Sequence, residues 1–501
     1  MNGKFQKRFA FKFESIYLIL LFALMAIAII VKAYFNVDGN LSRDSCHYLA
    51  LAQNLIEGNR LTIDNHFFVT WPIGYPFLIY LTAKLFFLPV FWASKVLNIL
   101  LIGFTLVLLK VVFRARAYLY GNIFLFSSYL EIFSYSWSET VYIFCLISFA
   151  TIIYQIVIKK PDEMFCLYVL IMFVSLLLFL SKYIGAFSFG VIGLLGLYHG
   201  ILKKNKSVAI ILIAIAIFNI MLMLGYLYNN YLETGFATGM ERIPSLESHK
   251  QLFLMLVKAI IAETIIHSNS TDLKANLVFV MQGFIIGYFI LANRKKIINP
   301  VEKNKIIGVS KLQIVFMTIG ILHLFFIVLM RWINHFDNFN FRLLAPGSFL
   351  LFIAIINYIE KNVAQPYFKA FKVLLISVSL FSWFINVPLG INPGKTKSYE
   401  ETIQHLKSRY SDVEPNSLVV FGSMHLKYLR TDICTIRPFF LPNHAEKENW
   451  DDFLNRVNPG HQKIVYFDTK EPQLKNDKYT FDKTVIELVN KYKHVDLVKL
   501  P

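Results

Sequence analysis

Long apolar stretches separated by short polar segments dominate the chain as far as about residue 390. A helix that crosses the hydrocarbon core of a bilayer needs about 20 mostly apolar residues. By this measure the sequence predicts about eleven crossings, at 15–34, 92–113, 118–134, 138–158, 164–181, 183–201, 206–226, 275–292, 311–331, 342–360 and 370–388. The pattern therefore predicts a polytopic α-helical membrane protein.

One further apolar stretch, 74–90, decides the predicted topology. If it crossed the membrane, the cations Arg114 and Arg116 would lie outside. If it lies at the membrane surface, every later loop obeys the positive-inside rule, because the basic segments in the cytoplasm are then 114–116, 159–160, 202–206, 293–296 and 369–372. We therefore expect 74–90 to be a juxtamembrane element that does not form a full crossing.

The side of the membrane on which each end of the chain lies follows from this topology. The first crossing comes after a basic N-terminal segment and has no evident small-residue cleavage site behind it. These features are typical of a retained signal anchor whose N-terminus lies in the cytoplasm. With about eleven crossings, the C-terminal tail then lies outside, and the expected location is the inner membrane of a bacterium.

The tail differs in composition from the rest of the chain. The change occurs at the N-P-G-K-T-K segment, 392–397, which reads as a linker. Two strands are predicted at 417–423 and 463–469, and helical periodicity occurs at 397–410 and 481–492. We therefore expect a membrane unit at 1–390, with a first outer loop at 35–91, followed by a small soluble extracytoplasmic α/β domain at 391–501.

Composition and charge exclude several classes of protein. The chain is 56% hydrophobic and only 16% charged, whereas a soluble domain carries about 25% charged residues. The net charge of +18 is spread over short inter-helix segments, so it suits cytoplasmic loops and predicts no nucleic-acid partner. The four cysteines form no C-x-x-C pair, and no phosphate-binding loop or dinucleotide fingerprint supports a nucleotide-driven pump.

The first outer loop holds the most informative residues. A helical pattern begins near Tyr48, and Ser42 or Asp44 could simply cap that helix. Alternatively, Asp44 is a carboxylate at the outer membrane surface that accepts a proton from an acceptor hydroxyl or amine. His47 suggests a metal, yet no second ligand stands at ligand spacing in this loop. A divalent metal is thus possible but unsupported by spacing, unless more distant His335 and Asp337 complete the site.

Polar groups also gather at the outer ends of later helices. Interfacial anchoring explains any one of them, but cations and carboxylates that converge on one face suit a lipid phosphate headgroup better. Cations around that phosphate would stabilise it as it departs. The residues concerned are Ser138, Glu139, Lys182, Tyr183, Arg242, Arg331, His335, Asp337 and Arg342.

The order of these motifs resembles the polyprenyl-phosphate-sugar-dependent glycosyltransferases of the GT-C fold, the group that includes protein O-mannosyltransferases and lipid A aminoarabinose transferases. The resemblance covers about 35–350. The motifs that carry it are Asp44 with Tyr48, Ala52 and Leu55 to Gly58, the pairs Trp71-Pro72 and Tyr75-Pro76, Ser138-Glu139, Lys182 to Gly185, Gly235 to Pro244, and Arg342 to Pro346.

The resemblance implies an inverting sugar transfer on the extracytoplasmic face, with Asp44 as the general base. The donor would be an undecaprenyl- or dolichyl-phosphate sugar, and the acceptor a lipid, a glycan or a protein. Many members carry a charged partner beside the aspartate or before the proline, where this chain has Ser45 and Trp71. We therefore assign the contacts to the lipid phosphate or the sugar to Lys182, Arg242, Arg342, Glu139, Tyr48, His335 and Asp337.

Two other classes of protein stay open. A transporter or lipid flippase would place ionisable residues near the middle of its crossings, beside broken helices, whereas the charges of this chain lie mostly at the predicted helix ends. A non-enzymatic scaffold that presents the tail would not need Asp44, Lys182, Arg242 and Arg342 on one face.

Overall fold

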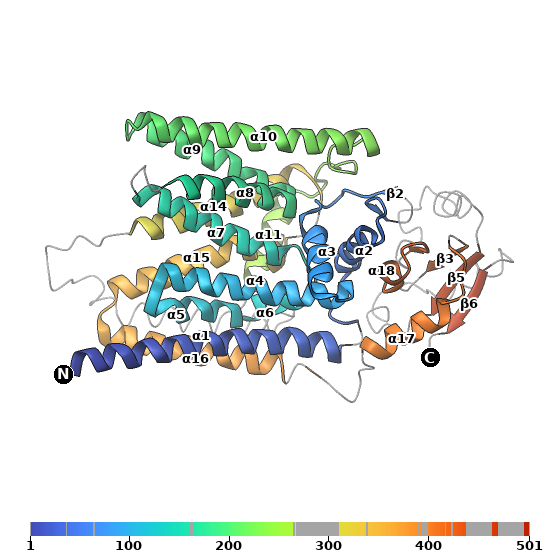
Figure 1. Cartoon of the computed structure of the whole chain (residues 1–501), viewed down its shortest axis with the longest axis horizontal. Helices are drawn as coiled ribbons and strands as arrows, with labels where there is room; N and C mark the ends of the chain where they lie inside the picture. Colours follow the sequence, from blue (N-terminus) through green and yellow to red (C-terminus); the bar gives the residue numbers. More distant parts are fainter. Residues whose placement is uncertain are drawn as a thin grey trace.

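Figure 1 shows a bundle of long helices that run side by side, with a smaller α/β unit at one end. The computed structural model describes residues 2–36, 38–63, 66–159, 164–263, 266, 310–336, 339–388, 391, 399–415, 417–421, 424–436, 463–468 and 495–499. Within these residues the bundle is built from long apolar helices. The helices pack along their length, so polar groups near their ends collect at the two ends of the bundle.

In the described part of the chain, eight segments are long and apolar enough to cross a membrane. The first, Glu14–Phe35, lies within α1 (Asn2–Phe35), and the second, Val90–Leu125, begins with α4 (Val90–Phe113). Five more coincide with α7 (Glu139–Ile158), α10 (Lys206–Thr234), α14 (Lys311–Ile333), α15 (Phe341–Asn362) and α16 (Gln365–Asn386). The eighth joins η4 (Tyr183–Ala186) to α9 (Phe187–Ile201), and α8 (Phe165–Ser181) is a shorter apolar helix. The expected polytopic helical class is confirmed. The total of about eleven stays a prediction, because 275–292 lies outside the described residues.

The stretch predicted as one crossing at 118–134 is not a single helix, and that expectation was wrong. After η1 (Arg114–Arg116) the chain forms α5 (Ala117–Gly121), η2 (Asn122–Leu125) and α6 (Ser127–Ser134), with an extended residue, Phe126, before α6. Tyr120 bonds Glu360 and Tyr129 bonds Ser348, both on α15. In one continuous helix, at about 100° per residue, these two tyrosines would point to opposite faces. The break lets both of them reach α15.

The first outer loop lies at one end of the bundle (Figure 1). It forms α2 (Arg43–Glu57), the short antiparallel strands β1 (Thr62–Ile63) and β2 (His66–Phe67), and α3 (Gly74–Phe86). Helix α3 has 13 residues, so it is roughly 20 Å long, against about 30 Å for the hydrocarbon core. Helix α3 is thus shorter than the hydrocarbon core, and the expectation that 74–90 is a juxtamembrane element stays a prediction.

The two ends of the bundle differ as the charge pattern predicts. In Figure 1 the N-terminus and the connections from α4 to α5, α9 to α10 and α15 to α16 lie at the left-hand end. The first two connections carry the basic segments 114–116 and 202–206, and 369–372 lies near the start of α16. The first outer loop and the C-terminal strands lie at the opposite end, beside the far ends of the same helices.

The tail forms a parallel sheet. Its strands are β3 (Leu418–Phe421), β4 (Cys434–Ile436), β5 (Lys463–Asp468) and β6 (Val495–Lys499), in the order β4-β3-β5-β6. All three pairings are parallel, with Val420 opposite Val465. Helices α17 (Tyr399–Tyr410) and α18 (Leu426–Leu429) accompany the sheet. The strands expected at 417–423 and 463–469 and the helix expected at 397–410 are present, and 481–492 lies outside the described residues.

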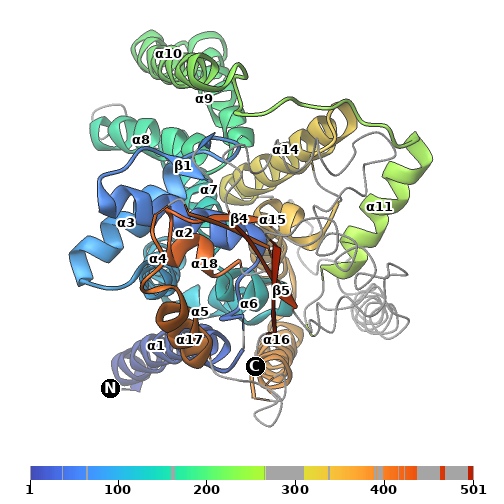
Figure 2. The same ribbon diagram turned by 90° about the vertical axis from the view of Figure 1, so that its right-hand side faces the viewer.

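The tail contacts the helix that carries Asp44. In Figures 1 and 2 α18 lies beside α2. The ring of Tyr399 stacks on Phe91 at 3.8 Å between centroids, and Thr431 donates a hydrogen bond to Glu57, the last residue of α2, at 2.8 Å. Helix α2 is therefore held from the tail side as well as from the bundle.

Candidate functional site

Ser42, and not Asp44, caps helix α2. The Ser42 hydroxyl oxygen accepts a hydrogen bond from the Ser45 backbone N–H at 3.3 Å, which satisfies one of the free donors of the first turn. Asp44 is the second residue of α2, where the helix dipole favours a negative charge. The capping alternative for Asp44 is thereby removed, and its carboxylate is free for other contacts.

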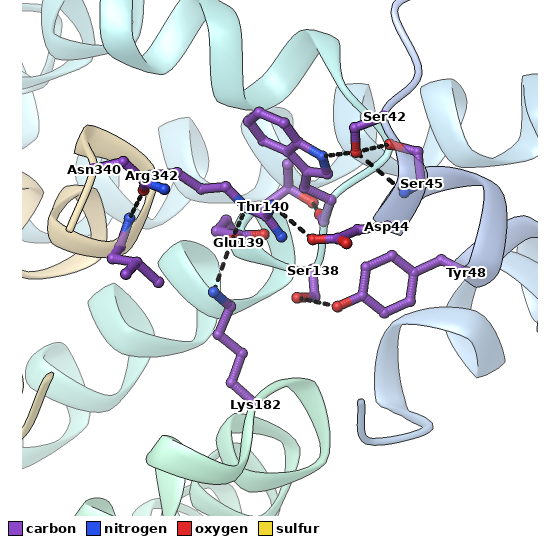
Figure 3. Close-up of polar contacts among 12 residues, drawn as sticks. Ser42, Asp44, Ser45, Tyr48, Ser138, Glu139, Thr140, Lys182, Asn340 and Arg342 are labelled. Carbon is purple, nitrogen blue, oxygen red and sulfur yellow. Dashed lines mark hydrogen bonds and ion pairs between the residues drawn. The ribbon is translucent and has the colours of Figure 1, made fainter. Parts of the chain in front are cut away.

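Four charged side chains form one continuous network at the end of the bundle that carries α2 (Figure 3). Arg342 Nη1 lies 2.7 Å from Asp44 Oδ2, and Arg342 Nε donates to Glu139 Oε1. Lys182 Nζ donates to the same Glu139 oxygen at 2.7 Å. Two carboxylates and two cations are thus joined, and their formal charges balance. Asp44, Glu139, Lys182 and Arg342 were all expected at the site, and the structure brings them together.

Each of these residues lies at or next to a helix terminus. Glu139 is the first residue of α7, and Arg342 is the second residue of α15, whose N-terminus is capped by the Asn340 side chain at 3.0 Å from Leu343 N. Lys182 directly follows α8 in an extended conformation. Charges at helix ends avoid the hydrocarbon core. A guanidinium at a helix N-terminus is unfavourable by itself, and the two carboxylates offset that cost.

The four side chains differ in exposure. The Glu139 side chain is fully buried, whereas Arg342, Lys182 and Asp44 are 15%, 19% and 23% exposed. A buried carboxylate is stable only when it is paired and hydrogen-bonded, and Glu139 has both cations as partners. Asp44 is the more accessible of the two carboxylates, so it is the one that an incoming molecule can reach.

The segment that precedes α7 joins this network to α2. Trp137 Nε1 donates to Ser42 Oγ at 2.6 Å, and the guanidinium of Arg342 lies over the Trp137 ring at 4.4 Å. Tyr48, which was expected at the site, donates its hydroxyl proton to Ser138 Oγ at 2.9 Å. Burial raises the Tyr48 pKa well above its ordinary value, so this phenol stays protonated.

Sequence reasoning missed Trp137. Its contacts with Ser42 and Arg342 place it within the site, where its ring binds the guanidinium face as a cation–π partner. The signal available was its position immediately before Ser138-Glu139 at an outer helix end. Tryptophan is common at that membrane depth in any case, so the position alone does not distinguish a site residue from an anchor.

Arg242 is close to this site through its loop but does not join the charged network. Its Nε donates to Thr238 Oγ1 at 2.8 Å. The loop rests on the first outer loop, because a Cβ added to Gly239 would lie 2.7 Å from the Val69 carbonyl carbon. The oxygen of that same carbonyl accepts a hydrogen bond from Tyr183 at 2.6 Å. Arg242 therefore lies near the residue that follows Lys182 in the chain.

His335 and Arg331 belong to a separate ion pair. Arg331 Nη2 donates to Glu247 Oε1 at 2.6 Å, and His335 Nδ1 lies 2.9 Å from the same oxygen. The hydrogen bond from Arg331 lowers the Glu247 pKa to about 2. His335 is thus placed on Glu247 and not on Asp44. Asp337, the other residue expected here, lies outside the described residues.

His47 packs among aromatic rings. Its ring centroid lies 5.4 Å from that of Phe68 and 5.1 Å from that of Trp71. Burial lowers the His47 pKa well below its ordinary value, so the imidazole is neutral. Over the described residues, no group of three or more His, Cys, Asp or Glu side chains is arranged to hold a metal ion. The expectation about a metal stays untested.

Comparisons with known proteins identify similar chains among solved structures only. No family model matches the chain, and no curated protein matches it. It is similar to ArnT from Cupriavidus metallidurans in the apo state, at 13% identity and a TM-score of 0.44, covering 91% of this chain and 94% of that one.

Two further solved structures are similar at the same level. ArnT from Cupriavidus metallidurans bound to undecaprenyl phosphate matches at 12% identity and a TM-score of 0.45, over 89% of this chain and 88% of that one. The apo Archaeoglobus fulgidus oligosaccharyltransferase matches at 13% identity and a TM-score of 0.43, over 85% of this chain and 65% of that one. At such identities the chemistry of this chain has to be argued from its own residues.

Proposed function

We propose that this chain is a membrane glycosyltransferase that moves a single sugar, a hexose or a pentose, from a polyprenyl-phosphate carrier to an acceptor on the extracytoplasmic face. The acceptor is a lipid, a glycan or a protein with a nucleophilic hydroxyl or amine. The observation that carries the proposal is the contact of Asp44 with Arg342, within the network that also holds Glu139 and Lys182. It brings a partly exposed carboxylate into contact with a cation at the end of the bundle that carries α2.

Asp44 acts as the general base. As the acceptor's O–H or N–H gives its proton to the Asp44 carboxylate, the acceptor lone pair forms a bond to the anomeric carbon. The bond from that carbon to the phosphate oxygen breaks, and its electron pair leaves with the polyprenyl phosphate. Because this is a direct displacement, the configuration at the anomeric carbon is inverted. Arg342 forms an ion pair with Asp44, and the contact orients the carboxylate.

Lys182 and Arg342 bind the phosphate. The guanidinium of Arg342 has five N–H donors, and its contacts with the two carboxylates use Nε and Nη1. The ammonium of Lys182 has three donors, one of which is given to Glu139. The remaining donors are available for phosphate oxygens, where charge-assisted hydrogen bonds stabilise the negative charge that develops on the leaving group.

Glu139 is a positioning residue in this mechanism. It is fully buried and holds both cations on one oxygen, so it fixes their separation before a substrate binds. Preorganised cations stabilise the transition state without the cost of rearrangement. Arg242 lies next to this group, through Tyr183, and we place it at the more distant part of the donor headgroup.

The proposal is tested with purified protein in liposomes, a radiolabelled undecaprenyl-phosphate sugar and a cell-envelope extract. Transfer of the label to an acceptor, with release of undecaprenyl phosphate, is the expected result. The Asp44→Asn variant should lose the transfer. Asp38→Asn is the matched control, because Asp38 lies on the same outer segment and contacts His425 in the tail.

The main alternative makes a different prediction in the same liposomes. A flippase would move the labelled lipid between leaflets without transferring its sugar. Two results together would contradict the glycosyltransferase proposal. All of the label stays on the polyprenyl carrier with every acceptor fraction, and the labelled lipid crosses the bilayer faster than in empty liposomes.

A further inference from the structure

Three buried polar side chains lie near the start of α4, at the same end of the bundle as α2 (Figure 1). Ser94, Lys95 and Asn98 are all at most 1% exposed. Helix α4 lies in a candidate membrane span, where buried polar groups are costly unless they are hydrogen-bonded and usually serve a function. The mechanism above uses none of the three.

Both the amide nitrogen and the amide oxygen of the Asn98 side chain form hydrogen bonds with other segments of the chain. Its Nδ2 donates to the carbonyls of Phe133 at 2.9 Å and Tyr135 at 2.7 Å. Its Oδ1 accepts from the hydroxyls of Tyr75 at 3.3 Å and Thr140 at 2.9 Å. An asparagine amide has two donors and one acceptor oxygen with two lone pairs, so one residue joins α3, α4, the end of α6 and the start of α7.

The neighbours of Asn98 hold the same segment. Lys95 Nζ donates to the carbonyl of Ser134, the last residue of α6, at 2.7 Å. The hydroxyls of Ser94 and Ser136 are 2.7 Å apart. Each residue from Phe133 to Ser136 therefore forms a hydrogen bond with a side chain of α4.

This stretch has little regular structure of its own. Residues 135–138 lie between α6 and α7, and Tyr135 is extended, with φ −78° and ψ 163°. Buried backbone groups outside a helix or sheet need other partners, and α4 supplies them. Within the stretch, Trp137 bonds Ser42 and Ser138 bonds Tyr48. The next residue is Glu139, which pairs with Arg342 and Lys182. The position of Glu139 thus depends on how α4 holds the residues before it.

We propose that Asn98 is a positioning residue for the charged site. Through its four hydrogen bonds it fixes the 133–140 segment and with it the Glu139 carboxylate that aligns Lys182 and Arg342. The inference rests on the proposed function. None of these four hydrogen bonds reaches Lys182 or Arg342, so its effect on catalysis acts through Glu139.

The sharpest substitution is Asn98→Asp, which keeps the shape but turns carboxylate oxygens toward the carbonyls of Phe133 and Tyr135. Asn98→Leu removes all polar contacts at similar volume. We expect the turnover to fall on the order of 10²-fold, the loss typical of a misplacement of about 1 Å. Thr105→Val is the matched control, because Thr105 is buried on the same helix and bonds only its own helix, at Leu101 O, among the described contacts.

A double-mutant cycle separates positioning from general destabilisation. If Asn98 acts through Glu139, then Asn98→Leu should cost little further turnover in a Glu139→Gln background. If the two losses multiply, the positioning role is wrong. Should both Asn98 variants fail to fold, Thr140→Val replaces them in the cycle, since it removes the hydroxyl that bonds Asn98 Oδ1 and the Trp137 carbonyl beside Glu139.

Amide hydrogen exchange gives a readout that needs no transferase activity. In Asn98→Leu the amides of 135–142 should exchange at least 10-fold faster than in Thr105→Val, because the segment has lost its restraint. Faster exchange in a protein whose wild type transfers no sugar would reject the proposed function and leave the positioning of this segment standing. Unchanged exchange at these amides would reject the inference, whatever the activity.

Discussion

Arg342 Nη1 lies 2.7 Å from Asp44 Oδ2, which joins the start of α15 to the first turn of α2. The same guanidinium bonds Glu139 at the start of α7 and covers the ring of Trp137. One side chain therefore connects three helices at their outer ends. Predictions about the site follow from removing its members one at a time.

Asp44→Asn should reduce turnover on the order of 10²- to 10⁴-fold, because the amide keeps the size of the carboxylate but cannot accept the proton. The affinity for the lipid-linked sugar should change little, since a carboxylate does not attract a phosphate. Initial rates and donor binding measure the two effects. Because Ser42 caps α2, folding should not change, and near-normal transfer by the folded variant would reject Asp44 as the base.

Arg342→Ala should impair both donor binding and turnover, each by at least roughly 10-fold, because it removes a charge-assisted contact to the phosphate. Arg342→Lys should rescue little, since one ammonium cannot reproduce the guanidinium's planar set of donors. The Michaelis constant for the donor and the turnover number test this. Arg116→Ala is the control, as Arg116 pairs with Glu360 at the other end of the bundle. An unchanged Michaelis constant in Arg342→Ala would place the phosphate elsewhere.

Glu139→Gln should destabilise the protein as well as slow it. Removing one partner of a fully buried ion pair costs roughly 3–5 kcal/mol, and the cost here should be smaller because Lys182 and Arg342 are partly exposed. Thermal unfolding in detergent measures the change. The control Glu233→Gln alters an exposed carboxylate near the end of α10 and should leave the midpoint almost unchanged. Equal midpoints for both variants would show that the Glu139 pairs contribute nothing.

Stability should fall as the pH rises through about 7, the value to which burial raises the pKa of Glu263. Glu263 lies against Ser348 and Tyr129. Its folded-state pKa exceeds the unfolded value of about 4.3, so the folded state binds the proton more tightly. The stabilisation is complete below the unfolded pKa and is lost above the folded one.

Unfolding midpoints between pH 5 and 9 test this linkage. In wild type the decline should end at about pH 7, above which Glu263 is ionised in both states. Glu263→Gln mimics the protonated form and should remove the decline below that pH. The same pH dependence in Glu263→Gln and in wild type would assign the decline to other groups.

The sequence by itself determined the membrane class, most helix positions and the sidedness of the charges. These properties depend on local composition, because a crossing needs an apolar run of a certain length whatever its neighbours are. The positive-inside rule led us to expect 74–90 at the membrane surface, and the same reading located Asp44, Glu139, Lys182 and Arg342 at helix ends on one face.

Only the tertiary structure decided which of these residues meet. Hydropathy cannot distinguish a stretch surrounded by protein from one surrounded by lipid. The sequence therefore predicted one crossing helix at 118–134, where the structure has three short helices. Ion pairing depends on the three-dimensional distances between helix ends, which are distant in sequence. The structure therefore decided that Glu139 holds both Lys182 and Arg342 and that His335 goes to Glu247. It also decided that Ser42 caps α2 in place of Asp44, because the Ser42 hydroxyl accepts the hydrogen bond from the Ser45 amide.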